Sequence, residues 1–296
     1  MSETLPLIYN PIAGGGCERK ARKAQKKLAA LGCQAELLPT SGVGSATSIA
    51  RRLAGAGAPR VAVAGGDGTI NEVINGLALS DTELAIIPAG TANVLAMEMQ
   101  VPLKIATACR LACESSSVTI DLGLAGSRYF ALMAGIGFDA LVIKNIIPAL
   151  KKSIRRAAFP VTGLVTLIQK DLSLLQAAAQ GHQSSGYFVI VANSRYYGGR
   201  FGPVPEASIT DGLLDVCVLK GKKLQKMLNF WAAALRQNHV DASLADYFRT
   251  TAVDINCPGG EPVPVQTDGE VIGELPLKVS VVPAALKICS GRNDLD

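Results

Sequence analysis

Histidine is nearly missing from this chain, and cysteine is thinly scattered. The 296 residues include two histidines and seven cysteines, with no Cys-x-x-Cys pair. A zinc site needs clustered Cys and His ligands, so none is expected, and neither is a catalytic triad built on histidine. The seven thiols are interpreted as reduced and mostly buried.

Long apolar runs are also lacking, and charge is sparse. No stretch of about 18 uncharged apolar residues occurs; the nearest, Ala157–Gln169, contains Pro160 and Gly163. The N-terminus has no basic region followed by an apolar core, so neither a signal peptide nor a transmembrane helix is predicted. Charged residues make up 18%, and the net charge of +5 favours an anionic partner such as ATP or an acidic membrane. The sequence contains no basic stripe with interleaved aromatic residues, so nucleic-acid binding is not predicted. The expected setting is a reducing cytoplasm.

Hydrophobic residues, at 49%, are enough for a sizeable core, and the length suits one large domain or two ordinary ones. The first ~115 residues alternate apolar strand patterns with helical ones. The expected strands are 5–10, 34–38, 60–64 and 83–87, and the expected helices are 18–31, 46–54 and 69–79. Strands that each feed a helix indicate a parallel sheet with helices on both faces.

The pattern then changes to strands separated by turns rich in Gly, Pro and Asp. These strands are expected at 118–122, 129–134, 187–192, 213–219, 252–256, 263–266 and 278–282. They indicate a mostly antiparallel β domain with helical insertions near 140–176 and 224–236. The fold class is therefore α/β plus β. The predicted domains are 1–120 and 121–283, and 284–296 is a candidate to complete the first.

Glycine-bearing turns follow three of the first four strands, at Gly14–Gly16, Gly65–Thr69 and Pro88–Gly90. Ligands of open α/β sheets bind at the carboxyl ends of the strands, where glycine lets the backbone approach a phosphate. Neither the P-loop pattern nor the dinucleotide fingerprint is present. An ordinary tight turn is the alternative for a lone Gly-Gly pair.

The turn Gly65-Gly66-Asp67-Gly68-Thr69 is more specific. Asp67 can be explained as a helix cap, but capping does not explain three glycines around it. An aspartate beside phosphates is repelled unless a cation lies between them, so Asp67 implies Mg²⁺.

Gly65–Val73 resembles the diacylglycerol kinase catalytic domain, which bacterial lipid kinases, sphingosine kinases and ceramide kinases share. Other segments match the family's motifs in order: Asn10-Pro11 with Gly14-Gly15, Pro88–Asn93, Ile120–Gly123, Asp211–Asp215 and Asp268–Glu270. The resemblance covers nearly the whole chain. It implies that the N-terminal domain is like that of NAD kinases. It also implies that the protein uses ATP and Mg²⁺ to phosphorylate the hydroxyl of a diacylglycerol-like or related lipid, which the β-rich domain would bind. The Gly-Gly-Asp-Gly-Thr turn alone is shared with NAD kinases.

By motif position, the resemblance assigns the nucleotide contacts. They are Asn10, Thr40, Gly66, Asp67, Gly68, Thr69, Ile70, Asn71, Glu72 and Thr91. For Thr40, the alternative to a nucleotide contact is that it is an ordinary turn or helix-cap residue. Asn71 and Glu72 are expected to position the metal or the substrate, or else to be solvated residues of a helix face.

The resemblance also assigns the base and a metal loop. Asp268 is the expected general base, with Glu270 as an assistant; a tight Asp-Gly turn is the alternative. A structural Mg²⁺ is expected on the carbonyls of Ser208 and Leu213 and the carboxylate of Asp211, with a simple β-turn as the alternative. Asp121 is expected either to reach the metal's water shell or to cap a turn.

The implied partner is a lipid at a membrane surface, with the protein peripheral on the inner face. The candidate docking residues are Lys144, Lys151, Lys152, Arg155 and Arg156, before the apolar stretch 157–169. A solvated helix face is the alternative, and the basic helix 18–31 is a second candidate. A kinase of a soluble substrate such as NAD and a catalytically silent nucleotide or lipid sensor are the competing functions. The identity of the lipid and a homodimer stay open.

Overall fold

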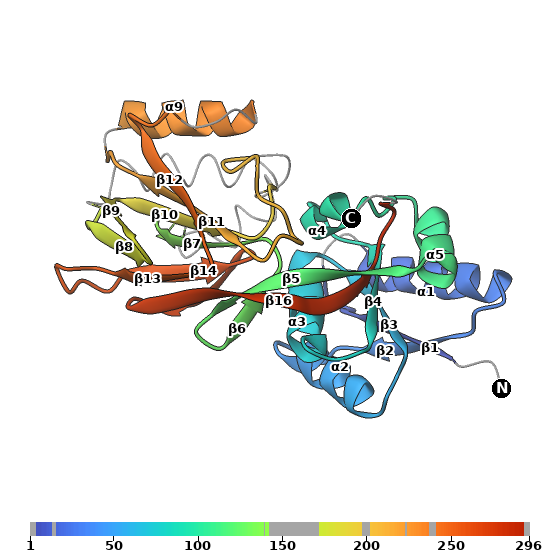
Figure 1. Ribbon diagram of the computed structural model, residues 1–296. Coiled ribbons are helices and arrows are strands. Elements are labelled where there is room, and N and C mark those ends of the chain that lie inside the picture. The colour runs from blue at the N-terminus through green and yellow to red at the C-terminus, as the bar shows by residue number, and fades with distance from the viewer. Residues whose placement is uncertain are drawn as a thin grey trace. The chain divides into compact units, whose positions relative to one another are not determined.

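The computed structural model describes residues 4–13, 16–138, 140–141, 172–196, 202–222, 224–236 and 241–292. The chain divides into two compact units (Figure 1). The first comprises the chain up to Leu122, Ile209–Gly212 and the segment from Val282; the second comprises Gly123–Ser208 and Leu213–Val281. Strands β5 (Ser117–Ala125) and β16 (Leu277–Cys289) run from one unit into the other.

The first unit is a parallel sheet with the order β2, β1, β3, β4, β16. Its strands are β1 (Leu5–Tyr9), β2 (Ala35–Pro39), β3 (Arg60–Gly65) and β4 (Glu83–Pro88). Its helices are α1 (Cys17–Ala30), α2 (Ser45–Gly55), α3 (Asp67–Leu77), α4 (Val94–Glu98) and α5 (Ile105–Glu114). Every residue of β1 is buried, as continuous apolar strands of a covered parallel sheet require. The parallel α/β unit is confirmed.

The second unit contains an antiparallel sheet with the order β12, β11, β10, β7, β14, β15. These strands are β7 (Met133–Gly137), β10 (Phe188–Ala192), β11 (Leu214–Leu219), β12 (Ala245–Thr250), β14 (Pro264–Thr267) and β15 (Glu270–Glu274). The remaining strands are β6 (Arg128–Phe130), β8 (Leu175–Ala179), β9 (His182–Gly186) and β13 (Ala252–Asn256), which pair among themselves and with β5 and β16. An apolar core joins residues of both groups of strands, among them Phe130, Val191 and Val253. The expected antiparallel β domain is confirmed.

A second apolar cluster lies on the other face of the antiparallel sheet that contains β10 and β11. Helix α9 (Leu224–Leu235) contributes Met227 and Phe230, and β10 contributes Phe188. Phe188 and Phe230 meet edge to face, with ring centroids 6.1 Å apart. The helix expected at 224–236 is therefore confirmed.

Several expected boundaries are wrong. The helical insertion drawn to residue 176 ends earlier, because 175–179 is strand β8. The strand expected at 129–134 is two strands, β6 and β7, separated at Ala131 and Leu132. The last expected strand does not stop at 282 but continues to Cys289, where Ile288 pairs with Leu84. Helices α4 and α5 and strands β9, β12 and β15 were not expected. Helix α4 has only five residues and β9 is polar, so neither shows a clear apolar period.

The chain beyond β16 fastens the short helix α4. The Arg292 guanidinium donates to a carboxylate oxygen of Glu98 at 2.9 Å, and the side chains are 13% and 2% exposed. Gly291 N–H and Ser290 Oγ–H both donate to the carbonyl of Met99, at 3.0 and 3.1 Å. Glu98 is thus a buried carboxylate whose charge is balanced by the guanidinium of Arg292.

Replacing Arg292 by Met should therefore destabilise the protein by about 3 kcal/mol, since removing one partner strands a buried charge. Urea unfolding would measure the change. Lys287→Met is the matched control, because its ion pair with Asp81 is exposed and should leave the midpoint unchanged. An Arg292 variant as stable as the control would contradict the account.

Candidate active site

The first unit gathers four loops at one edge of its sheet. Because β1 to β4 are parallel, the residues after each strand, Asn10, Thr40, Gly66 and Ala89, emerge at the same end. Thr40 N–H donates to the carbonyl of Tyr9 at 2.9 Å, which joins the first two loops. This edge holds most of the residues expected to contact the nucleotide.

The glycine turns after β3 and β4 touch each other. A Cβ built on Gly90 would lie 2.5 Å from the Cα of Gly66, a distance that side chains do not tolerate. Ala89 and Gly90 both donate their N–H groups to the carbonyl of Gly65, at 3.0 Å each. Glycine is therefore required because two backbones pack directly against each other. The close approach leaves both turns with bare backbone at the sheet edge.

The carboxylate of Asp67 connects these turns. Its two oxygens accept hydrogen bonds from the N–H groups of Asn93, at 3.0 Å, and Val94, at 2.7 Å. Burial raises the pKa of the Asp67 carboxyl above its ordinary value, and the hydrogen bonds from Val94 and Asn93 oppose that shift. The structure does not support the alternative that Asp67 caps its own helix, because α3 has no side-chain cap hydrogen bond and the Asp67 carboxylate binds the start of α4 instead.

Asn93 closes the second turn on itself. It adopts a left-handed backbone (φ 53°), and its Oδ1 accepts the N–H of Gly90 at 2.9 Å. Its amide also donates to the carbonyl of Gly90 at 3.2 Å. Short polar side chains tolerate this conformation best, which accounts for Asn at this place in the motif.

Lys20 reaches the same edge, and sequence reasoning missed it. Its ammonium donates to the carbonyl of Ala89 at 2.8 Å, and the side chain is half-buried. In the sequence Lys20 is one of six basic residues of an amphipathic helix, and it resembles a solvated residue. The signal that could have found it is its position: it lies in the first turn of the helix that follows the Asn10-Pro11 motif.

The other expected nucleotide residues have diverse surroundings. Thr91 is exposed, and Gly68 and Thr69 form the first turn of α3, where backbone N–H groups lack acceptors within the helix. The side chain of Ile70 belongs to the core, at 1% exposure, and its N–H donates to the carbonyl of Gly66. Ile70 therefore offers no side chain to a nucleotide.

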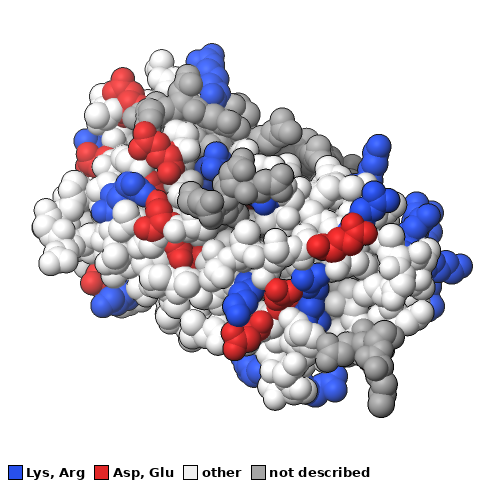
Figure 2. Space-filling view, turned by 45° about the vertical axis from the view of Figure 1, so that its right-hand side comes forward, with Lys and Arg blue, Asp and Glu red and all other residues white. Residues whose placement is uncertain are grey.

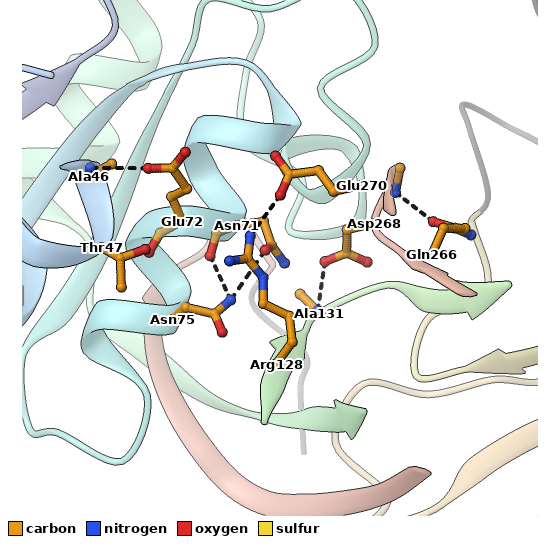
Figure 3. A network of polar contacts seen from close by, with 11 residues as sticks. Ala46, Thr47, Asn71, Glu72, Asn75, Arg128, Ala131, Gln266, Asp268 and Glu270 are labelled. Carbon is orange, nitrogen blue, oxygen red and sulfur yellow. Dashed lines mark hydrogen bonds and ion pairs between the residues drawn. The ribbon is translucent and has the colours of Figure 1, made fainter. Parts of the chain in front are cut away.

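Asn71 and Glu72 are not the solvated helix residues that the alternative reading expected. Asn71 is 2% exposed and accepts a hydrogen bond from the amide of Asn75 at 3.2 Å. The Glu72 carboxylate accepts the N–H of Ala46 in the first turn of α2, at 3.1 Å (Figure 3). Thr47 Oγ1–H donates to the Glu72 carbonyl at 2.8 Å. Glu72 thus helps to hold α3 against α2, whereas the hydrogen bond between Asn71 and Asn75 lies within α3.

In the second unit, the carboxylate of Asp268 is held by three consecutive backbone N–H groups. Ala131 donates to Oδ2 at 2.9 Å (Figure 3). Leu132 and Met133 donate to Oδ1 at 3.0 Å each. Asp268 has a left-handed backbone, with φ 47°. These bonds explain why the chain interrupts its strand between β6 and β7: the N–H groups there bind a carboxylate.

Neighbouring polar groups support this turn. Gln266, 1% exposed, accepts the N–H of Gly269 at 2.8 Å, and Asn193 donates from its amide to the carbonyl of Ala131 at 3.0 Å. Glu270 forms an ion pair with Arg128 at 2.7 Å (Figure 3). Asp268 is consequently the oriented carboxylate, and Glu270 is engaged by a cation.

The expected Mg²⁺ loop, Ser208–Leu213, is organised by Asp121. Asp121 donates its N–H to the carbonyl of Ile209 at 2.8 Å, and its carboxylate accepts the N–H of Gly212 at 2.7 Å and of Ala284 at 2.8 Å. Of the two expectations for Asp121, capping a turn is the one that these hydrogen bonds support. Position 212 has a left-handed backbone conformation, with φ 70°, which favours glycine there.

The donor atoms assigned to that loop, two carbonyl oxygens and the exposed carboxylate of Asp211, have the chemistry of a Mg²⁺ site. In the described part of the chain, no cluster of three or more His, Cys, Asp or Glu side chains is arranged to hold a metal. A cation here would therefore depend on backbone carbonyls.

Some expectations lie outside the described residues. They are Gly14 and Gly15 of the first motif, the basic cluster Lys144 to Arg156, and the apolar stretch 157–169. Where the structure is described, it contains no helix of the length and hydropathy needed to cross a bilayer.

Comparison with known proteins defines the class of this fold and site. The family model described as the diacylglycerol kinase catalytic domain matches residues 4–125, and that of the YegS C-terminal NAD kinase β-sandwich-like domain matches residues 133–290. The chain belongs to the diacylglycerol kinase catalytic-domain family. The expectation drawn from the motifs is confirmed.

Individual relatives agree. The chain is 31% identical to a protein of Pseudomonas aeruginosa (strain UCBPP-PA14) named "Probable lipid kinase YegS-like", over 97% of this chain and 93% of that one. It is 29% identical to the diacylglycerol kinase of Bacillus subtilis (strain 168), over 91% and 90%. A crystal structure titled as a diacylglycerol kinase from Bacillus anthracis str. Sterne superposes with a TM-score of 0.76 at 23% identity, covering 98% and 97%, which shows the same fold. Family membership supports a kinase.

Gly90→Ala should separate the two glycine turns, because the new methyl would overlap the backbone of Gly66. We expect a loss of about 1–3 kcal/mol in the free energy of unfolding and at least about tenfold weaker ATP binding. Gly55→Ala is the control, since a Cβ there meets nothing within 4 Å. Calorimetric titration with ATP and thermal melting would follow both; a Gly90 variant that binds ATP like the control would refute the packing argument.

Proposed function

We propose that this protein is an ATP-dependent lipid kinase that transfers the γ-phosphate to a lipid hydroxyl. The observation that carries the proposal is the contact between the two glycine turns at the carboxyl edge of the parallel sheet, in a chain that belongs to the diacylglycerol kinase catalytic-domain family. The lipid part draws on the relatives named lipid kinase and diacylglycerol kinase.

The nucleotide's phosphates would lie along the edge formed by Asn10, Thr40, Gly66 to Thr69 and Thr91. The N–H groups at the start of α3 supply donors, and the helix dipole favours anions there. Lys20 supplies a positive charge beside these turns. Glu72 acts indirectly, by fixing α3 against α2. Asn71 is a buried residue of the same helix.

Phosphoryl transfer needs little covalent help from a protein beyond positioning and charge stabilisation. The lipid oxygen attacks the γ-phosphorus, the bond to the bridging oxygen breaks, and ADP leaves. Asp268 would accept the hydroxyl proton, and its three backbone hydrogen bonds fix the direction of the carboxylate. Mg²⁺, the usual partner of ATP, would neutralise phosphate charge. Asp67 is the carboxylate that the glycine turns contribute, and the Ser208–Leu213 loop offers a second set of oxygen donors.

Incubation with γ-labelled ATP and Mg²⁺, followed by extraction into organic solvent, tests the function. The acceptors would be diacylglycerol, phosphatidylglycerol, a long-chain base, a polyprenol and NAD. Label in a lipid product supports the proposal. Aqueous labelled NADP would indicate a soluble substrate, and ATP binding without transfer to any acceptor would indicate a sensor; both results contradict the proposal.

Asp268→Asn should lower turnover by roughly 10²–10⁴-fold, because the amide cannot take a proton, while the affinity for ATP stays unchanged. Single-turnover assays and ATP titration separate the two effects. Glu270→Gln is the control and should retain most of the turnover, because Glu270 is committed to an ion pair with Arg128. Substantial transfer by the Asp268 variant would place the base elsewhere.

Lys20→Met should weaken ATP binding by about 10- to 100-fold, the usual range for losing a hydrogen bond to a charged group. Lys27→Met, on an exposed turn of the same helix, should bind ATP normally. Isothermal titration with ATP and with adenosine provides the check, since only the ligand with phosphates should respond. Equal affinity of wild type and the Lys20 variant would remove Lys20 from the site.

A further inference from the structure

Helix α1 carries the entire net charge of the protein. Its 14 residues include six Lys and Arg and one Glu, a net charge of +5, which equals the formal net charge of the whole chain. The other residues hold 23 basic and 23 acidic side chains, and so balance. The net charge of this one helix therefore equals that of the whole chain.

The charge of α1 lies on its outer face. Buried Cys17, Ala21, Ala24 and Leu28 form the stripe that packs inward. The exposed basic residues are Arg19, Arg22, Lys23, Lys26 and Lys27. In Figure 2, which brings forward the side of Figure 1 where α1 lies, Lys and Arg gather on the right of the visible face.

Solubility does not require this arrangement. A mixture of acidic and basic residues would solvate the face equally well, and like charges four positions apart destabilise a helix. Such pairs occur at Arg19 and Lys23 and at Lys23 and Lys27. Basic residues in the first turn also oppose the helix dipole. An ion pair within the helix joins Arg22 to Glu18. A bound anionic surface would relieve the repulsion among the rest.

We propose that the outer face of α1, residues Arg19, Arg22, Lys23, Lys26 and Lys27, docks on a bilayer that contains anionic lipids. The proposal rests on the proposed function, because an enzyme with a lipid substrate must meet a bilayer. Basic side chains near an anionic membrane are attracted to it within a screening length. The helix carries no aromatic side chain that would stack on bases, which favours lipid over nucleic acid.

Co-sedimentation with vesicles of equal parts phosphatidylcholine and phosphatidylglycerol tests the surface. The triple variant Lys23→Gln, Lys26→Gln and Lys27→Gln should bind roughly 100-fold more weakly, at about fivefold for each charge lost. The matched control replaces Arg51, Arg52 and Lys104, which are exposed elsewhere on the same unit, by Gln and should bind like the wild type. A Lys-to-Arg triple at the α1 positions should keep the binding. Thermal melts show whether each variant is folded.

Undiminished binding of the α1 triple, or an equal loss in the control, overturns the proposal. The proposal is also overturned if the wild-type protein does not bind anionic vesicles, or if it binds an oligonucleotide more tightly than it binds the vesicles. Turnover on an acceptor dispersed in detergent should be the same for the α1 triple and wild type, because docking is then bypassed. If no acceptor is phosphorylated but vesicle binding still depends on α1, the kinase function fails while the docking surface stands.

Discussion

The contact between the turns that follow β3 and β4 is the constraint on which the nucleotide edge depends. Gly66 and Gly90 meet backbone to backbone, and the Asp67 carboxylate crosses from one turn to the other to bind Asn93 and Val94. Burying that charge is unfavourable and raises the pKa of the Asp67 carboxyl, and the two N–H donors oppose this shift. The same junction places Lys20 against Ala89. The two turns thus present bare backbone at the edge of the sheet, beside one buried carboxylate that two backbone N–H groups stabilise.

Two other aspartates of the family motifs act in the same way. Asp121 accepts N–H groups from Gly212 and Ala284, and Asp268 accepts three consecutive ones from 131–133. Each of the three therefore ties together segments that are distant in sequence, within its own unit. A carboxylate that accepts backbone hydrogen bonds is held in one orientation, which is the requirement for a base or a metal ligand. The structural role of these three residues is therefore compatible with the chemical roles proposed for Asp67 and Asp268.

Much of this could be predicted from the sequence, and the failures have physical causes. Continuous apolar strands followed by helices gave the parallel unit, because burial on both faces leaves a plain pattern in strands such as β1. The break between β6 and β7 was invisible, since it arises from Asp268, more than a hundred residues away. Glu72 as an anchor for α2 and Lys20 as a member of the edge also depend on tertiary contacts. A motif predicts which residues matter, and only the fold shows what each one touches.

The central claim is that ATP phosphates bind where the two glycine turns meet. Hydrogen–deuterium exchange of the wild-type protein, with and without ATP and Mg²⁺, tests it directly by reporting on the backbone N–H groups themselves. The account predicts slower exchange on ATP binding in two segments, 66–70 and 89–94, and a weaker response to adenosine. Protection confined to other segments, or none in these two at saturating ATP, would contradict it.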